Sequence, residues 1–225
     1  MKIRLFILPL ILIISSLNSC VKSDDSSLNL SAISFIHAAP GLGPVDFYLN
    51  GGRVNGDSII AYNDTIPHKL LSSGTIAIVV KKYISSTTYI STSIELENEK
   101  NYSFFVAGQP NAVSSLLIND DLSAPLSGKA KLRFINLSPD APSLNFKLNA
   151  NTLFGTMAFK AYSDFNSIDP GNHTISISNA TNGAILSEQN LTVEAGMIYT
   201  VWANGLVETP ESGLALSMKV IALQP

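Results

Sequence analysis

The amino-acid sequence contains one phrase twice, and this repeat constrains the fold more than any other feature. SAISFIHAAPGLGPVDFYLNGG (residues 31–52) returns later as AKLRFINLSPDAPSLNFKLNAN (residues 130–151). Further matches keep the same order along the chain, because Tyr102 corresponds to Tyr199 and Gly108 to Gly205. An ordered series of matches at a nearly constant offset indicates a tandem duplication. We therefore expect two copies of one domain.

Each copy has the two-residue periodicity of β-strands. In VDFYLN, Val45, Phe47 and Leu49 alternate with a second set of side chains, and LNFKLN (residues 144–149) repeats this alternation. Such alternation places one set on a core and the other in solvent. Gly, Pro, Asn and Asp separate the short apolar runs, and no segment has a helical stripe with caps at both ends. The pattern predicts an all-β fold of two tandem antiparallel β-sandwich domains, with about six or seven strands each.

The composition of the connecting segments sets the domain boundaries. We place the first sandwich at residues 32–122 and the second at 130–225, with a linker at 123–129. Residues 20–31 are polar and have the composition of a flexible tether. Because the linker is short, we expect the two domains to sit end to end with limited swing. The chain has a single cysteine, so each core rests on packing without an intrachain disulfide.

The N-terminal residues have the features of a bacterial lipoprotein signal. Lys2 and Arg4 precede the apolar run LFILPLILIISSL, which is too short for a bilayer-spanning helix. The run leads into LNSC, which resembles a lipobox, so we expect a signal peptide at residues 1–19 and lipidation of Cys20. Several acyl chains would anchor the protein stably in a membrane. KSDD (residues 22–25) resembles the export signal of Bacteroidetes surface lipoproteins. We expect an outer-membrane lipoprotein displayed at the cell surface, with a periplasm-facing anchor as the alternative.

Composition and motifs argue against catalysis, cofactors and nucleic-acid binding. The formal net charge is −3, and Lys81-Lys82 is the one basic pair, so the basic face that phosphates require is missing. The sequence has neither a nucleophile elbow nor a glycine-rich phosphate loop, and its histidines lack metal-ligand partners at short spacing. Asn119–Asp121 groups several oxygens without the regular spacing of a calcium loop. We therefore predict no catalytic residues, no cofactor and no metal site.

Several segments resemble a known family. FIHAAPGLGPVDFYLNG and RFINLSPDAPSLNFKLN are similar to the opening of the bacterial domain-of-unknown-function 4397 family. DPGNHTISI and AGMIYTVWANG are similar to later elements of that family, and the resemblance covers nearly the whole chain after the tether, twice. It implies an immunoglobulin-like or transthyretin-like sandwich in a secreted setting, and it implies no chemistry.

Two polar positions of the family motif differ between the copies. The first copy has His37 and Asp46, and the second has Asn136 and Asn145. Because both positions change together, we expect each pair to be hydrogen-bonded across neighbouring strands. A catalytic dyad would not tolerate two asparagines in the sister copy. We therefore interpret the pair as a structural tie.

Aromatic residues and two short motifs give the main hints of function. Tyr162 lies in the second copy, and Trp202 is expected in the core because apolar residues flank it. DSI and DTI resemble the O-glycosylation sites of Bacteroidetes exported proteins, at Ser58 and Thr65. Exposed aromatic rings are a usual means of binding sugars or peptides. The tyrosines of the first copy that we expect to be exposed are Tyr48, Tyr62, Tyr83 and Tyr89.

These features favour a lipid-anchored, non-catalytic binding or adhesion protein of the cell envelope. Its expected partners are the membrane, through the lipid anchor, and a glycan or protein ligand. The alternative is a structural or assembly subunit of an envelope complex, in which the edge strands of a sandwich pair with a partner.

Overall fold

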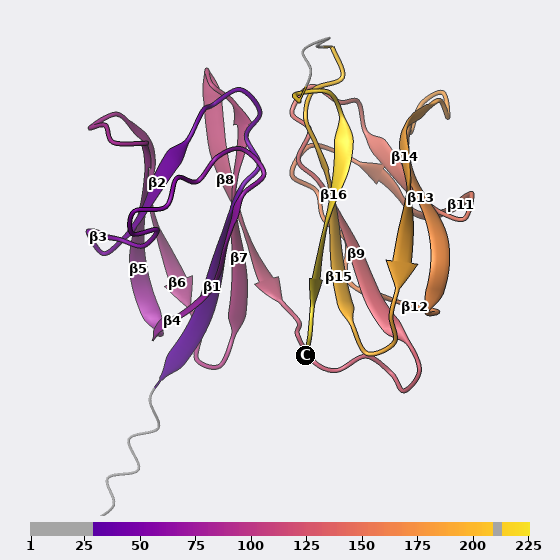
Figure 1. The fold of residues 1–225 in the computed structure, drawn as a ribbon, viewed down its shortest axis with the longest axis horizontal. Helices are drawn as coiled ribbons and strands as arrows, with labels where there is room; N and C mark the ends of the chain where they lie inside the picture. Colours follow the sequence, from indigo (N-terminus) through magenta and orange to yellow (C-terminus); the bar gives the residue numbers. More distant parts are fainter. Residues whose placement is uncertain (1–28, 209–212) are drawn as a thin grey trace, which may run out of the picture.

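The computed structural model describes residues 29–208 and 213–225 (Figure 1). The expected signal peptide, Cys20 and most of the expected tether lie outside the described residues. Within them the chain is all-β, as predicted. The described part of the chain contains no helix that could span a bilayer. The first strand begins at Leu30, and Ser31 is buried in it, so the expected tether boundary at residue 31 is wrong.

The first domain is a sandwich of two four-stranded sheets, with the orders β4-β1-β7-β8 and β3-β2-β5-β6. Strands β1 and β7 pair in parallel, and the other neighbours pair antiparallel. A parallel pair needs a long connection, and most of the domain lies between these two strands. The strands are β1 (Leu30–His37), β2 (Val45–Leu49), β3 (Gly52–Arg53), β4 (Thr65–Ser72), β5 (Gly74–Lys82), β6 (Thr88–Leu96), β7 (Asn101–Gln109) and β8 (Ala112–Asp120).

The second domain repeats the first strand for strand. Its sheets have the orders β12-β9-β15-β16 and β11-β10-β13-β14, and β9 pairs with β15 in parallel. The two-sandwich prediction is therefore confirmed, while the strand number per domain is higher than expected and one pair per domain is parallel. The strands are β9 (Ala130–Asn136), β10 (Leu144–Leu148), β11 (Asn151–Met157), β12 (Asn166–Ile168), β13 (Gly171–Asn179), β14 (Ile185–Val193), β15 (Ile198–Asn204) and β16 (Ser217–Leu223).

Each sandwich has its own core, built from the inward residues that the alternation predicts. Phe35 of β1 packs on Phe47 of β2, with ring centroids 5.0 Å apart. In the second domain, Phe134 of β9 stacks on Phe146 of β10 at 4.6 Å. All four rings are fully buried. Aromatic residues dominate core burial because of their large apolar area, so each domain is held together without a disulfide.

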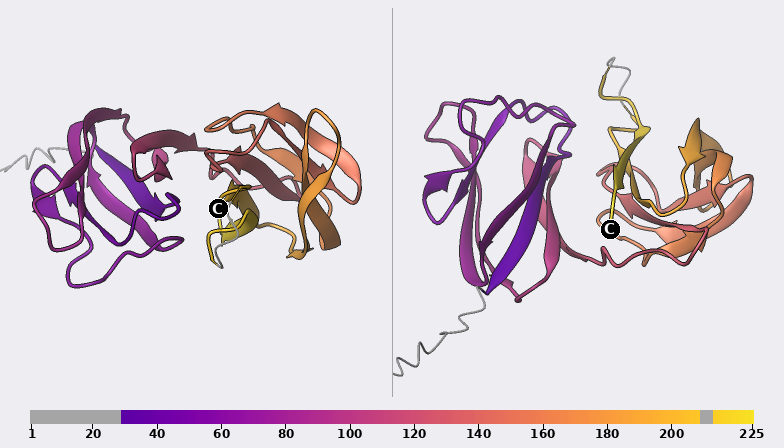
Figure 2. Two further views of the ribbon diagram at one scale, coloured as in Figure 1. Left: turned by 90° about the horizontal axis from the view of Figure 1, so that it is seen from above. Right: turned by 60° about the horizontal axis from the view of Figure 1, so that its bottom comes forward.

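The two domains pack face to face, and the expected end-to-end arrangement is wrong. Sheet β4-β1-β7-β8 lies against sheet β12-β9-β15-β16, so the chain forms a stack of four sheets (Figures 1 and 2). Strands β1 and β9 are buried on both faces, and a sheet with apolar residues on both faces needs cover on both. A shared apolar cluster joins the domains. Its buried members are Ile36, Ala38, Phe105, Ala107, Ile118, Ile135, Leu137 and Trp202.

Equivalent positions of the two copies meet in this interface. Ile36 pairs in register with Phe105, and Ile135 pairs in register with Trp202. The Phe105 and Trp202 rings contact each other edge to face, with centroids 6.1 Å apart. Both copies thus use the same face, as the subunits of a two-fold symmetric dimer do. Trp202 is buried, as predicted, but in the shared cluster between the domains and not in the core of its own sandwich.

A buried ion pair crosses the same interface. Arg133 of β9 donates from Nη2 to Asp120 Oδ1 of β8 at 2.5 Å, and the two side chains are 4% and 0% exposed. Arg133 Nε also donates to Thr200 Oγ1 at 2.9 Å, and Ser103 Oγ donates to Asp120 Oδ2 at 2.7 Å. The position of copy 1 that corresponds to Arg133 is Ser34. Ser34 lines the same enclosed space between the domains as Arg133. A small side chain in one copy leaves room there for the long arginine of the other.

Candidate binding site

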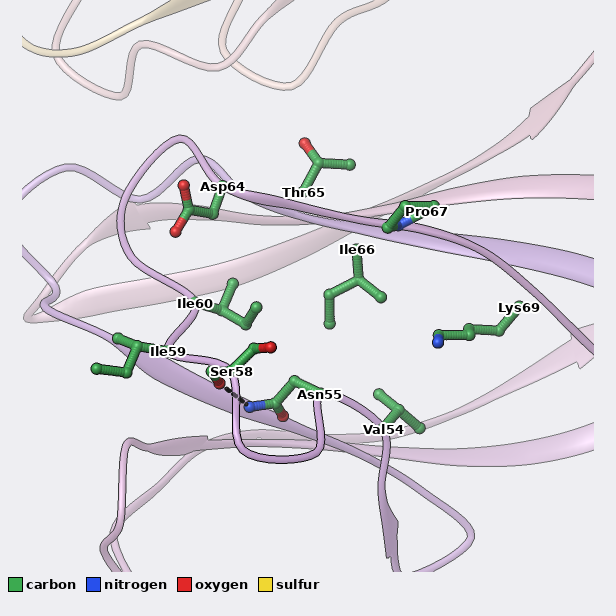
Figure 3. Close-up of a pocket in the computed structure, with 10 residues that line it drawn as sticks. All are labelled: Val54, Asn55, Ser58, Ile59, Ile60, Asp64, Thr65, Ile66, Pro67 and Lys69. Carbon is green, nitrogen blue, oxygen red and sulfur yellow. Dashed lines mark hydrogen bonds between the residues drawn. The ribbon is translucent and has the colours of Figure 1, made fainter.

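A cleft opens on the side of the first sandwich, between the loop that follows β3 and the edge strand β4 (Figure 3). Its volume is about 360 Å³. The loop, residues 54–64, connects the two sheets at this edge, and β4 pairs only with β1 among the described strands. The residues that line the cleft are Val54, Asn55, Ser58, Ile59, Ile60, Asp64, Thr65, Ile66, Pro67 and Lys69.

The inner wall of the cleft is apolar. Ile60 and Ile66 are buried and belong to the core of the first domain. Ile59 stands at the mouth of the cleft with 55% of its surface exposed (Figure 3). A single exposed isoleucine is ordinary on a protein surface. Beside a concave apolar wall, however, it extends the surface on which an apolar part of a ligand could pack.

Hydrogen bonds hold the loop of the cleft in place. Asn55 Nδ2 donates to the Ser58 carbonyl at 2.7 Å, which Figure 3 shows, and to Asp46 Oδ1 at 3.0 Å. Asn55 Oδ1 accepts the Phe47 backbone N–H at 3.1 Å. At the other end of the loop, Asp64 Oδ2 accepts the Ala61 N–H at 2.8 Å. The cleft is therefore formed before any ligand arrives, which reduces the ordering cost of binding.

Asp46 connects this loop to the rest of the sheet. Its Oδ1 accepts Arg53 Nη2 at 2.6 Å and Arg53 Nε at 3.0 Å, in addition to Asn55. Its Oδ2 accepts the Ile84 N–H at 3.0 Å, from the turn between β5 and β6. Burial raises the pKa of Asp46, but the hydrogen bonds from Asn55, Ile84 and Arg53 outweigh it, so the pKa lies below its ordinary value. The carboxylate therefore stays ionised and joins β2 to β3, to the loop after β3 and to the turn between β5 and β6.

The expected hydrogen bond between His37 and Asp46 is wrong, because each side chain has other partners. His37 Nδ1 accepts the Ala39 N–H at 3.4 Å, and Nε2 lies 2.7 Å from the Gly43 carbonyl. Since a carbonyl only accepts, Nε2 carries the proton and the ring is neutral. Burial lowers the pKa of His37, which agrees with a neutral ring. The residue fastens the loop between β1 and β2.

The asparagines of the second copy also bind backbone groups, but only the bond of Asn136 to the Ser138 N–H repeats a bond of the first copy. Asn136 Oδ1 accepts the Ser138 N–H at 3.1 Å, and its Nδ2 donates to the Met157 carbonyl at 3.0 Å. Asn145 Oδ1 accepts the Thr156 N–H at 2.9 Å. An asparagine thus offers one acceptor and one donor, as the neutral histidine does. The joint exchange of both positions reflects two separate backbone ties in each copy.

The comparison with family models agrees with the tandem duplication. A family model described as "Domain of unknown function (DUF4397)" matches residues 31–147 and 138–218. The chain belongs to the DUF4397 family. The comparison with curated proteins gives no match.

Among solved structures, the chain matches a CBM26 module from Eubacterium rectale Amy13K in complex with maltoheptaose. The match has 10% identity and a TM-score of 0.27, and it covers 87% of this chain and 97% of that one. This TM-score is too low for the match to bear on the fold or on a ligand.

The tyrosines of this DUF4397 chain lie in different environments. Tyr62 is partly buried between the domains, where its hydroxyl accepts Asn204 Nδ2 at 3.0 Å, and burial raises its pKa to about 12. Tyr89 is partly buried against the first core, whereas Tyr162 is 48% exposed. Tyr48 and Tyr83 are also half-buried, so the prediction that the four tyrosines of the first copy are exposed is wrong. Tyr48 and Tyr83 lie on another face of the first domain, where Lys81 lies over the Tyr48 ring and Arg53 over the Tyr83 ring.

The structure also places the remaining sequence predictions. Ser58 and Thr65, the predicted O-glycosylation sites, are both exposed and line the cleft, and their modification stays a prediction. Within the described residues, no three His, Cys, Asp or Glu side chains lie close enough to hold a metal ion. The carboxylates of Asp120 and Asp121 form ion pairs with Arg133 and Lys131 of the second domain.

Arg53, Asn55 and Ile59 are site residues that the sequence did not indicate. They lie in GRVNGDSII (residues 52–60), a segment with the composition of a turn. No motif or spacing connects Asn55 or Arg53 with Asp46, because the bond depends on how the chain folds back after β3. The one available signal was the polar Asp46 in an otherwise apolar strand.

Proposed function

We propose that this chain is a non-catalytic binding protein of the bacterial cell envelope, anchored by lipid at Cys20, and that its ligand enters the cleft of the first domain. The observation that carries the proposal is the exposed Ile59 beside a concave wall and a loop already fixed by hydrogen bonds. Preformed concave sites with an apolar wall and a few polar groups are the usual form of binding sites. The ligand is a glycan or a peptide that offers both an apolar face and hydrogen-bonding groups.

The side chains of the cleft support binding over catalysis. Its ionisable residues are Asp64 and Lys69. The Asp64 carboxylate accepts a hydrogen bond from the Ala61 N–H and is exposed to solvent. General acid–base chemistry on a glycan needs a pair of carboxyl groups in different environments, and hydrolysis of a peptide needs a nucleophile beside a base. The cleft offers neither arrangement.

The test is a binding screen with a matched pair of variants. Fluorescently labelled protein is applied to arrays of glycans and of peptides, and each hit is measured again with Ile59→Asp and Ile185→Asp. Ile185 is 51% exposed on β14 of the other domain, so it controls for a charge placed on an exposed isoleucine. Loss of binding by at least tenfold in Ile59→Asp alone is the expected result. Equal binding by both variants would refute the cleft as the site.

The lipid anchor and its orientation need a separate experiment. Intact cells that express the wild type or Cys20→Ala are treated with protease, and the protein is followed by immunoblot. Digestion of the wild type without lysis, together with release of Cys20→Ala from the membrane fraction, is the expected result for a surface lipoprotein. Protection until the outer membrane is broken would refute surface display and favour the periplasm-facing anchor.

The second candidate function is assembly by strand addition, and strand β6 is the observation that favours it. Thr88–Leu96 pairs only with β5 among the described strands, contains no proline and carries one charge, on Glu95. Long edges without proline or several charges are prone to pair with other chains. β4 is a poorer edge because Pro67 interrupts it. Sedimentation equilibrium without ligand tests the idea, and a single monomeric species at all concentrations would refute self-assembly.

A further inference from the structure

The outer face of sheet β3-β2-β5-β6 carries a group of aromatic and cationic side chains. This sheet is the layer of the first domain that lies farthest from the second domain (Figure 1). The inward residues of β2 fill the core, so Asp46 and Tyr48 point outward. The register pairs Lys81 of β5 with Asp46, and Arg53 of β3 with Tyr48. Cross-strand partners share a face of the sheet, so these side chains form one group on the outer face.

Two cations of this group are held in place and keep unused hydrogen-bond donors. Arg53 uses two N–H groups on Asp46, and its guanidinium lies over the Tyr83 ring with Cζ 5.6 Å from the centroid. The rest of its five N–H groups have no partner within the described residues. Lys81 Nζ lies 4.9 Å from the Tyr48 ring centroid, and no hydrogen bond or ion pair joins it to the described part of the chain.

The surroundings of these cations suit an anionic polymer. Asp46 is 2% exposed and its charge is offset by the paired Arg53, so Lys81 is the cation of this group without a counter-ion among the described residues. Next to Lys81 along β5 and β6, the outward positions include Ala77, Ser91 and Ser93, which are small and exposed, and the exposed acidic Glu95 follows at the far end of β6. A flat face with small side chains fits an extended chain better than a compact small ligand, which needs a concave pocket.

The second domain provides an internal comparison. By strand register, its residues at the positions of Asp46, Tyr48, Arg53 and Lys81 are Asn145, Lys147, Thr152 and Ser178. The fold is the same, but the fixed arginine, the aromatic ring beside it and the lysine of β5 are all absent from these positions. The fold therefore does not require the cationic group, since a copy without it forms the same sheet.

We propose that the cationic face of the first domain, defined by Tyr48, Arg53, Lys81 and Tyr83, is a second binding surface that takes an acidic polysaccharide with uronate carboxylates. The Arg53 fork, fixed by Asp46, binds a carboxylate through two donors. Lys81 contributes a second positive charge on the neighbouring strand. Each contact is weak at a solvent-exposed surface, so affinity comes from several uronates of one chain. This surface lies outside the cleft and takes a different ligand, although Asp46 joins Arg53 to the cleft residue Asn55.

The test uses polygalacturonate and its fully methyl-esterified form, which differ only in the charge of the carboxyl group. Binding is measured by biolayer interferometry at low and high salt with the wild type, Lys81→Gln, and Lys147→Gln as the control on the second domain. We expect binding of polygalacturonate only, an affinity about tenfold lower in Lys81→Gln, an unchanged affinity in Lys147→Gln, and weaker binding at high salt. Equal losses in both lysine variants, or no binding of polygalacturonate, would overturn the proposal.

Two further measurements separate the remaining explanations. Poly-glutamate tests an acidic peptide chain, and binding as tight as that of polygalacturonate would overturn the assignment to a polysaccharide. Arg53→Lys keeps the charge but loses the two-donor fork, so we expect roughly a fivefold loss of affinity while the circular dichroism spectrum stays that of the wild type. Ile59→Asp should leave polygalacturonate binding unchanged, which separates this surface from the cleft.

Discussion

Removing the carboxylate of Asp120 is expected to destabilise the whole chain, because it leaves a buried arginine without its counter-ion. Arg133 is 4% exposed, and its Nη2 lies 2.5 Å from Asp120 Oδ1. Its other contacts are the Thr200 hydroxyl and the face of Phe165, with Cζ 4.7 Å from the ring centroid. Neither is a charge. Removal of one partner from a buried pair costs about 3–5 kcal/mol, so we expect Asp120→Ala to lower the free energy of unfolding by about that amount.

Urea denaturation followed by tryptophan fluorescence measures this effect. Trp202 is the single tryptophan of the chain and packs on Phe105 between the domains, so its emission reports on the interface that the ion pair crosses. With a denaturant slope of about 2–3 kcal/mol per molar, the loss corresponds to a midpoint lowered by roughly 1–2.5 M urea.

The double variant Asp120→Leu with Arg133→Met separates the charge effect from the packing. Replacement of both members of a buried ion pair by apolar residues is often neutral or stabilising, so we expect it to recover most of the lost stability. Two results would contradict the reasoning. A loss below about 1 kcal/mol in Asp120→Ala would mean that water reaches Arg133 as it does in surface pairs. A double variant as unstable as Asp120→Ala would assign the cost to the Ser103 hydrogen bond or to packing.

Two further predictions concern the interface and the motif histidine. Trp202→Ala should lower stability by about 3–5 kcal/mol. Trp202→Phe introduces the residue that the other copy has at this position, and it should cost far less because the buried indole N–H has no partner within the described residues. Differential scanning calorimetry measures both variants, and equal losses would contradict the packing argument. Burial lowers the pKa of His37, so the unfolded chain binds its proton more readily, and stability at this site is complete above about pH 6.5 and falls below it. His37→Asn, which copies Asn136, should remove that part of the decline; melting temperatures between pH 7.5 and 5 test this, and an unchanged slope would refute it.

Several features of each domain were predictable because they depend on local pattern. Val45, Phe47 and Leu49 alternate with outward residues, and the two-residue period of a strand fixes which side chains face the core. The repeat predicted that the second copy would reuse this arrangement, and Leu144, Phe146 and their neighbours do so.

The role of polar residues was harder to predict, because it depends on which segments meet. His37 and Asp46 change together between the copies, which suggested one shared bond. Each instead holds a different piece of backbone, Gly43 and Ile84 respectively. Covariation of two positions shows that both respond to their surroundings, and only the folded chain identifies the partner of each.

A tandem duplication of a β-sandwich with self-sufficient apolar cores was predictable from the sequence alone, because strand periodicity and repeated turns are local properties. The face-to-face stacking of the two copies, the place of Trp202 between them and the ion pair of Arg133 with Asp120 depend on the tertiary structure. A strand that is apolar on both faces must be covered twice, but its sequence does not say by what. The cleft and the cationic face depend in the same way on loops and strands that meet only in three dimensions.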